Sequence, residues 1–189
     1  MRNLTFLSSF VLFAWFGATT PSHAASKKIH FQQSQALINF SSVEARVLSA
    51  ALSAREFDFS LTSKLASSLS QAVSQAKKHV DKTTDLLEDS DEKLRPKLEK
   101  LRKNLVEAER QLEKLEKDLQ NQVKPYMDFV ENDEGDGEAP PSPNWEALKK
   151  HVAWVAQDLK KASQLQRNLA GRLRIKKLPV LRKPKGSRN

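Results

Sequence analysis

The chain has 189 residues, a mass of 21.4 kDa and a formal net charge of +9 at pH 7. This length corresponds to one domain, with or without tails. Because the sequence contains no cysteine, it excludes disulfides, cysteine-based zinc sites, iron–sulfur clusters and thiol catalysis.

The N-terminus has the three parts of a secretory signal peptide. Arg2 gives the positive start, residues 4–17 are almost wholly apolar, and Ser22-His23-Ala24 has the small-x-small pattern of a cleavage site. The apolar run is shorter than the ~20 residues that span a bilayer. We therefore expect residues 1–24 to be a signal peptide cleaved near Ala24, and the protein to be exported to the periplasm or the extracellular space. An uncleaved N-terminal anchor is the alternative.

Glycine and proline are absent from long stretches of the chain. No glycine occurs between Ala18 and Glu134, and no proline occurs between Ser22 and Arg95. Because β-hairpins place such residues at their turns, this region is not a β-meander. The sequence predicts an all-α protein built from long helices.

The strongest periodic pattern is a row of leucines whose spacing alternates between four and three residues. We call this row the leucine seam. It comprises Leu94, Leu98, Leu101, Leu105, Leu112, Leu115 and Leu119. Ala108 fills the gap in it, and the same spacing continues to Gln122 and Tyr126. The pattern predicts a coiled-coil helix, and we expect its seam to contact a protein partner or a second copy of the chain.

Upstream of the seam, Ser41 and Glu44 have the spacing of a capping box, in which each side chain accepts a free backbone N–H at a helix start. This predicts a helix from about residue 42, preceded by an N-terminal segment over residues 25–41. Polar and apolar residues alternate over residues 57–62, which leaves open whether the helix breaks there.

A run of acids at residues 88–92, followed by Pro96, favours a turn between two helices. Acids stabilise a helix N-terminus, and a proline inside a continuous helix costs about 3 kcal/mol. The sequence therefore predicts a helical hairpin over residues 42–130 with its turn near residues 88–95. One kinked helix over the same residues is the alternative.

The last third of the chain divides by composition. Residues 131–143 hold five acids, no base and several glycines and prolines, which indicates a linker. Residues 144–173 repeat the three–four apolar spacing and predict a third amphipathic helix. The expected architecture is an elongated antiparallel three-helix bundle or coiled coil, or a four-helix one if the first helix is split, with a flexible basic tail over residues 174–189.

Positive charge is concentrated at the C-terminus, where residues 167–189 hold nine bases and no acid. Such a segment attracts the phosphates of lipopolysaccharide, anionic membranes or nucleic acid. The candidate polyanion contacts are Arg172, Arg174, Lys176, Lys177, Arg182, Lys183, Lys185 and Arg188.

No catalytic motif is present. His30, His79 and His151 do not have the H-E-x-x-H spacing of a zinc site, and the chain has neither a G-x-S-x-G motif nor a phosphate-binding glycine loop. We expect no enzyme, no cofactor, no metal and no small-molecule substrate.

The plan of a basic, cysteine-free, exported coiled coil is similar to that of periplasmic holdase chaperones of the Skp type. An exported helical bundle also resembles the minor pilin components of type IV secretion. Since the sequence holds no motif of either family, neither resemblance assigns a role to a residue. The sequence predicts a non-enzymatic scaffold or adaptor of the cell envelope. A polyanion-binding module and a holdase-like periplasmic chaperone are the alternatives.

Overall fold

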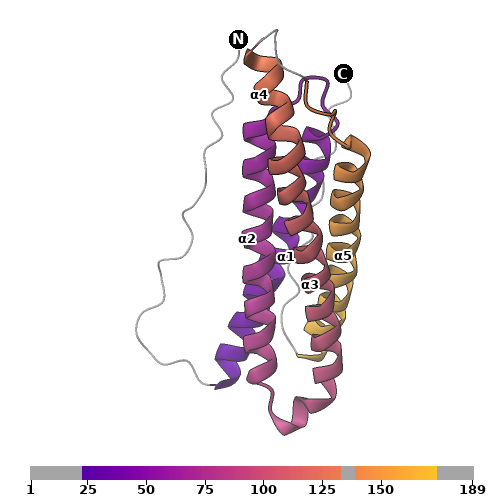
Figure 1. Ribbon diagram of the computed structural model, residues 1–189. Coiled ribbons are helices and arrows are strands. Elements are labelled where there is room, and N and C mark those ends of the chain that lie inside the picture. Colours follow the sequence, from indigo (N-terminus) through magenta and orange to yellow (C-terminus); the bar gives the residue numbers. More distant parts are fainter. Residues whose placement is uncertain (1–22, 133–138, 174–189) are drawn as a thin grey trace, which may run out of the picture.

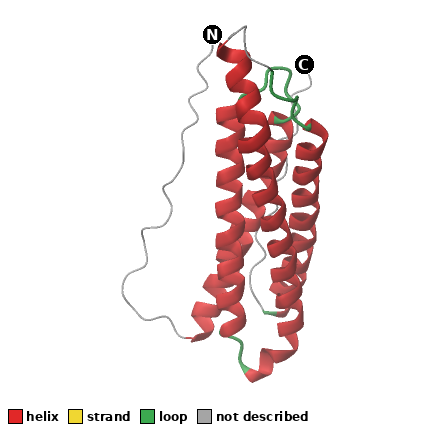
Figure 2. Cartoon of the chain, viewed as in Figure 1, coloured by secondary structure: helices red, strands yellow, loops and turns green. Residues whose placement is uncertain are grey.

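The computed structural model describes residues 23–132 and 139–173, and this part of the chain is all-helical (Figures 1 and 2). It contains four long helices. The third of them consists of α3 and α4, which are joined by a π-helical turn without a break. The elements are α1 (His23–Ala51), α2 (Phe59–Asp85), the 3-10 helix η1 (Asp89–Leu94), α3 (Arg95–Asp118), the π-helical turn η2 (Leu119–Val123), α4 (Lys124–Asn132) and α5 (Trp145–Arg172). The all-α class is confirmed, and of the two predicted helix counts the structure has four, because the first predicted helix is split.

The four long helices lie side by side and run alternately up and down (Figure 1). α1 packs against α2 and α5, and α3 packs against the same two helices. α1 and α3 are therefore diagonal to each other, as are α2 and α5. α5 ends at the same end of the molecule at which α1 begins and α2 turns into α3.

The leucine seam lies in the core. All seven of its leucines are at most 4% exposed, and burying each one stabilises the fold by about 1.5–3 kcal/mol. The seam is continuous with the buried faces of α2 and α5. These faces include Ala66, Leu69, Val73, Ala76 and Val80 of α2, and Leu148, Val152, Val155, Leu159, Ala162 and Leu169 of α5. The chain's own helices therefore cover the seam.

The predicted start of the first helix near residue 42 is wrong. α1 begins at His23, so residues 25–41 are helical, and Ser41 is buried in the middle of the helix. Glu44 does not cap a helix, because its Oε1 accepts a hydrogen bond from Ser68 Oγ of α2 at 3.1 Å. The helix extends upstream because Phe31 and Ile38 continue the buried face N-terminally.

The hairpin predicted over residues 42–130 is interrupted, because α1 ends at Ala51 and α2 begins at Phe59. Asp58 sets the new start, since its side chain accepts the backbone N–H of Leu61 at 2.8 Å. An aspartate in this position satisfies one of the free N–H groups at a helix start. This break raises the number of long helices from three to four.

The turn predicted near residues 88–95 is present, and the alternative of one kinked helix is excluded. α2 ends at Asp85, η1 follows, and Pro96 lies in the first turn of α3, where its missing N–H costs nothing. The buried Lys27 of α1 forms ion pairs with Asp91 and, at 3.8 Å, with Glu88. These pairs hold the start of α1 against the turn.

The leucine seam does not continue to Gln122 and Tyr126 as the spacing predicted. In η2 the N–H of Lys124 bonds the carbonyl of Leu119, so this turn contains one extra residue. The extra residue rotates the following helix, and Val123 is fully buried in place of Gln122.

α5 covers the region predicted to be the third amphipathic helix. Its N-cap is Asn144, whose side chain accepts the N–H of Ala147 at 3.0 Å. Trp145 packs edge-on against Phe57, with 4.9 Å between ring centroids. Within residues 23–132 and 139–173, no helix combines the length and the hydropathy that a membrane span requires.

A buried polar contact joins α1 to α5. Gln166 Nε2 donates to Ser34 Oγ at 2.7 Å, and Ser34 Oγ donates to the carbonyl of Phe31 at 2.8 Å. Both side chains are almost fully buried. We predict that Ser34→Ala lowers the free energy of unfolding by about 1–3 kcal/mol, because it leaves a buried amide N–H without an acceptor. Urea denaturation followed by circular dichroism measures this loss.

Ser42→Ala is the matched control, because Ser42 Oγ bonds the Ile38 carbonyl of its own helix. We expect this control to lose less stability than Ser34→Ala. Equal stability of Ser34→Ala and wild type would contradict the role given to the Ser34–Gln166 contact.

Candidate binding surfaces

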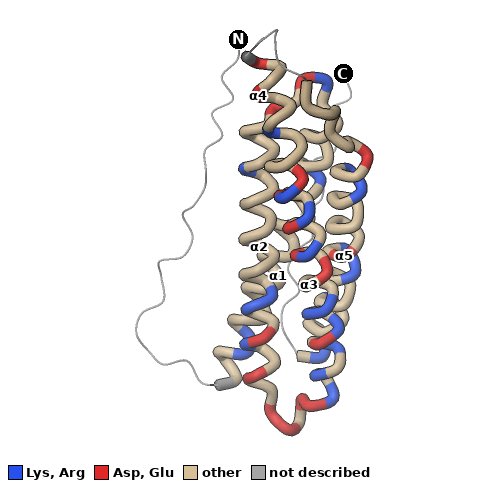
Figure 3. The backbone as a smooth tube through the Cα atoms, in the orientation of Figure 1, with Lys and Arg blue, Asp and Glu red and all other residues tan. Residues whose placement is uncertain are grey.

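The outward side of α5 is positively charged, and we call it the basic face. Its exposed cations are Lys149, Lys150, Lys160, Lys161, Arg167 and Arg172. Figure 3 shows the blue segments along this helix. α5 contains two acids, Glu146 in its first turn and Asp158. Asp158 is buried and pairs with Lys161 Nζ at 2.8 Å, so it offsets the charge of this one lysine.

An aromatic ring lies among the cations of the basic face. Trp154 is 39% exposed, and Lys150 Nζ lies 5.1 Å from the centre of its ring. This cation–π contact contributes about 0.5–1 kcal/mol at an exposed site. The indole therefore stays at the surface, with a cation fixed beside it.

His151 packs against Trp154. The two rings meet edge to face, with 5.8 Å between centroids. His151 Nδ1 lies 2.9 Å from Gln111 Oε1 of α3, and because a carboxamide oxygen only accepts, Nδ1 is the donor. Nε2 of His151 lies 3.5 Å from Asp118 Oδ2. The histidine thus joins α5 to α3 and also contacts the Trp154 ring.

The predicted polyanion contacts are only partly placed. Arg172 is exposed in the last turn of α5. The other seven lie between residues 174 and 189, outside the described residues. The sequence analysis placed the positive charge in that segment and missed that α5 itself carries a basic face. The available signal was the excess of cations over acids in residues 145–172, six against two.

The leucine seam is covered by other helices of the same chain. Its leucines were predicted to contact a partner, but side chains this deeply buried have no exposed surface to offer. The reason is that α2 and α5 present complementary apolar faces within the same chain. Any contact with a partner has to use the outer faces of the helices.

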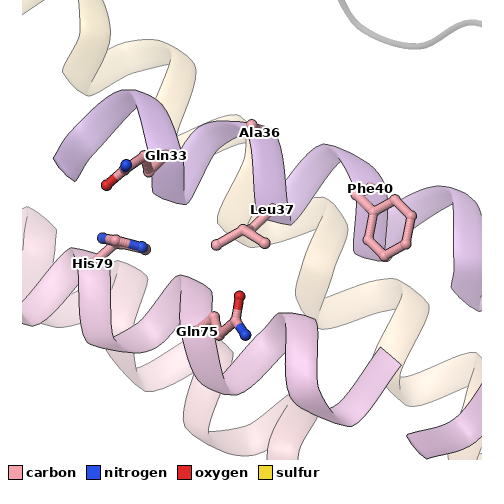
Figure 4. Close-up of a pocket in the computed structure, with 6 residues that line it drawn as sticks. All are labelled: Gln33, Ala36, Leu37, Phe40, Gln75 and His79. Carbon is pink, nitrogen blue, oxygen red and sulfur yellow. The ribbon is translucent and has the colours of Figure 1, made fainter. Parts of the chain in front are cut away.

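A second surface, on α1 and α2, has no charge. Residues 29–43 of α1 and 65–76 of α2 contain no Asp, Glu, Lys or Arg. α2 is accordingly almost free of blue and red over this stretch in Figure 3. We call the outward side of these two segments the uncharged face. It contains a hollow between the helices, lined by Gln33, Ala36, Leu37, Phe40, Gln75 and His79 (Figure 4).

His79 lies at one end of this hollow and contacts His30 of α1. The two Nδ1 atoms are 3.1 Å apart and the rings are stacked, so one Nδ1 donates and the other accepts. This arrangement requires at least one neutral imidazole. Burial lowers the pKa of His79 below its ordinary value of 6.5, and the charges of His30 and Lys82 lower this pKa further.

Within the described residues, no three His, Asp or Glu side chains lie close enough together to hold a metal ion. In comparisons with known proteins, no family model matches the chain, and neither a curated protein nor a solved structure is significantly similar to it.

We predict that the protein loses stability as the pH falls below about 6.5, and that His79 accounts for part of this loss. Unfolded His79 takes up a proton at its ordinary pKa of 6.5, whereas the folded protein takes it up at a lower pH. Between these two values the unfolded state binds more protons, so the free energy of unfolding decreases as the pH decreases.

His79→Gln should flatten the dependence of urea midpoints on pH below 6.5. Burial raises the pKa of Glu44 and Glu116 above 4.5, so these groups have the opposite effect on stability at lower pH. Because the variant keeps both carboxyls, the difference between variant and wild type isolates the histidine. Identical slopes for the two proteins would contradict the prediction.

Proposed function

We propose that this protein is an exported, non-enzymatic scaffold of the cell envelope. In this proposal its helices form an antiparallel bundle that holds the basic face of α5 against an anionic lipid surface, such as lipopolysaccharide or an anionic membrane. The observation that carries the proposal is the row of exposed cations on α5, with Trp154 among them.

The length and the direction of α5 support this function. Its 28 residues extend about 42 Å, so its cations are spread along a line rather than gathered in a pocket. This suits an extended array of phosphates better than a single small anion. α5 also leads directly into residues 174–189, which hold seven further bases.

Trp154 favours a lipid surface over nucleic acid as the polyanion. Tryptophan is enriched where water meets lipid, because its ring is apolar and its N–H is polar. Lysine and arginine side chains beside it reach the headgroup phosphates, and each adds about 1 kcal/mol near an anionic membrane. One exposed ring on a rigid helix does not form the series of stacking rings typical of single-strand binding.

Export is compatible with the position of α1. Cleavage near Ala24 removes residues 1–24 and leaves α1 whole from its first turn onward, with Lys27 still paired to Asp91. An exported scaffold of this kind needs no disulfide, because its long apolar core supplies the stability.

A protein-binding adaptor is the second candidate, and the uncharged face favours it. Because the leucine seam is internal, coiled-coil contact with a partner through that seam is no longer part of the proposal. An adaptor would instead use α1 and α2, where Phe40 is exposed. A holdase-like chaperone would use the same outer faces to hold unfolded chains.

We predict that Lys160→Glu/Arg167→Glu weakens binding to vesicles that contain anionic lipid by about 10-fold or more at low salt. Each reversed charge removes an attraction and adds a repulsion. The two residues lie seven apart on the exposed side of α5, so both reach the same surface. Vesicle co-sedimentation at several salt concentrations measures the change, which should shrink as screening increases.

The matched control is Lys100→Glu/Lys103→Glu, which makes the same change of charge at exposed positions of α3. Its binding should stay within about 2-fold of wild type, since α3 mixes acids with bases. Removal of residues 174–189 should also weaken binding. Equal losses in the α5 and α3 variants would mean that net charge alone, rather than the basic face, drives the attraction, and would contradict the proposal.

A further inference from the structure

The uncharged face combines three features that the helix packing does not explain. Phe40 is 45% exposed and lies at one end of the hollow. A hollow of about 400 Å³ lies directly beside this ring, between α1 and α2 (Figure 4). The carbonyl oxygen Oε1 of Gln33, which lines the hollow, is buried and has no hydrogen-bond donor within the described residues. A projecting aromatic ring and an adjacent cavity therefore share one face.

We propose that the uncharged face is a two-fold contact surface between two copies of this chain, in which Phe40 of each copy is seated in the hollow of the other. A two-fold contact pairs a patch with itself, so the patch must carry both a projection and the cavity that receives it. The uncharged face carries both.

The geometry along α1 meets this requirement. Phe40 and Gln33 are seven residues apart, which is about 10.5 Å or two turns on one side of the helix, and Ala36 lies between them. A two-fold axis near Ala36 places Phe40 of each copy at the Gln33 end of the other copy's hollow. The small side chain of Ala36 allows the two copies of α1 to approach closely at the axis.

Charge favours this face, rather than α3 or α5, for contact between two copies. The chain has a formal net charge of +9, so two copies repel each other wherever cations face cations. On α3, 14 of 24 residues are charged, and α5 carries the basic face. The uncharged face, 15 residues of α1 beside 12 of α2, is where two copies meet with the least repulsion.

The hollow also offers hydrogen-bonding groups without fixed charge. Gln75 lies across the hollow from Leu37 and has a carboxamide that both donates and accepts. In a two-fold pair, Gln75 of one copy is available to bond polar groups of the other. His79, whose pKa is lowered, adds no fixed charge at neutral pH.

This contact goes beyond the proposed function and does not depend on it. α5 is diagonal to α2, so dimerisation through α1 and α2 leaves both basic faces free. A dimer then presents two such faces, and a surface that engages both is bound more tightly than by either alone.

Sedimentation velocity of the purified protein over a range of concentrations tests the proposal. We expect a reversible dimer whose dissociation constant rises by at least about 30-fold in Phe40→Glu, the effect of removing a central aromatic anchor. Val106→Glu is the matched control, because Val106 of α3 is a similarly exposed apolar residue at 38%, and it should leave the constant unchanged. Circular dichroism confirms that both variants fold.

A second measurement uses the absence of cysteine from the chain. Under mild oxidation, Ala36→Cys should form a disulfide-linked dimer in high yield, whereas Val106→Cys should not. A wild-type protein that stays monomeric at all concentrations, or equal effects of Phe40→Glu and Val106→Glu, would overturn the proposal. Loss of the dimer on deletion of residues 174–189, with no effect of Phe40→Glu, would assign the contact to that segment and overturn it as well. Vesicle binding by the α5 variants is scored separately, so failure of one proposal does not imply failure of the other.

Discussion

The rest of the structure depends on the burial of the leucine seam of α3 by other helices. A helix that is charged on every other side has one apolar stripe, and this stripe has to be removed from water by other helices. α2 and α5 cover it within the same chain, and α1 closes the opposite side by packing on the same two helices. As a result the longest apolar stripe is used for folding, and binding is left to the outer faces, whose chemistry differs from helix to helix.

Apolar burial does not by itself determine how the helices are aligned along their length. Polar contacts at three positions along the helices favour one alignment over others. Lys27 meets Asp91 at one end, Ser34 meets Gln166 further along α1, and His151 meets Gln111 between α5 and α3. Sliding one helix by a turn would leave these groups buried without partners, at a cost of about 1–3 kcal/mol each. Such contacts select one alignment, as single polar residues do in coiled coils.

Much of this fold is predictable from spacing, and the failures have physical causes. Apolar residues, mostly small in α2 and larger in the leucine seam and α5, occupy most of the inward positions of these helices, so periodicity alone finds them. In α1 the same three–four pattern includes Ser34 and Ser41, which are polar residues at buried positions. Because of these serines, a search for apolar periodicity does not detect the helix. The π-helical turn η2 is likewise invisible, because nothing in the spacing shows that Val123 rather than Gln122 turns inward.

The candidate surfaces are harder to predict than the fold because they depend on which charges neutralise one another. α3 contains more cations than α5, but its eight cations stand among six acids, and several of its charges are paired. Arg102 bonds Asp81 at 2.7 Å, Lys77 of α2 bonds Glu109, and Arg110 bonds Glu107 at 3.0 Å. Amino-acid composition alone does not distinguish these paired cations from the cations of α5.

The difference appears only when the helices are packed. α5 has two acids against six cations, and Asp158 pairs with one of them, Lys161, so the positive charge of this helix is largely not offset by its own acids. At physiological salt the field of a surface charge decays over about 8 Å, and paired charges cancel within that distance, whereas a row of like charges does not. α5 therefore carries the larger net positive charge of the two helices, although the sequence of α3 is the more densely charged.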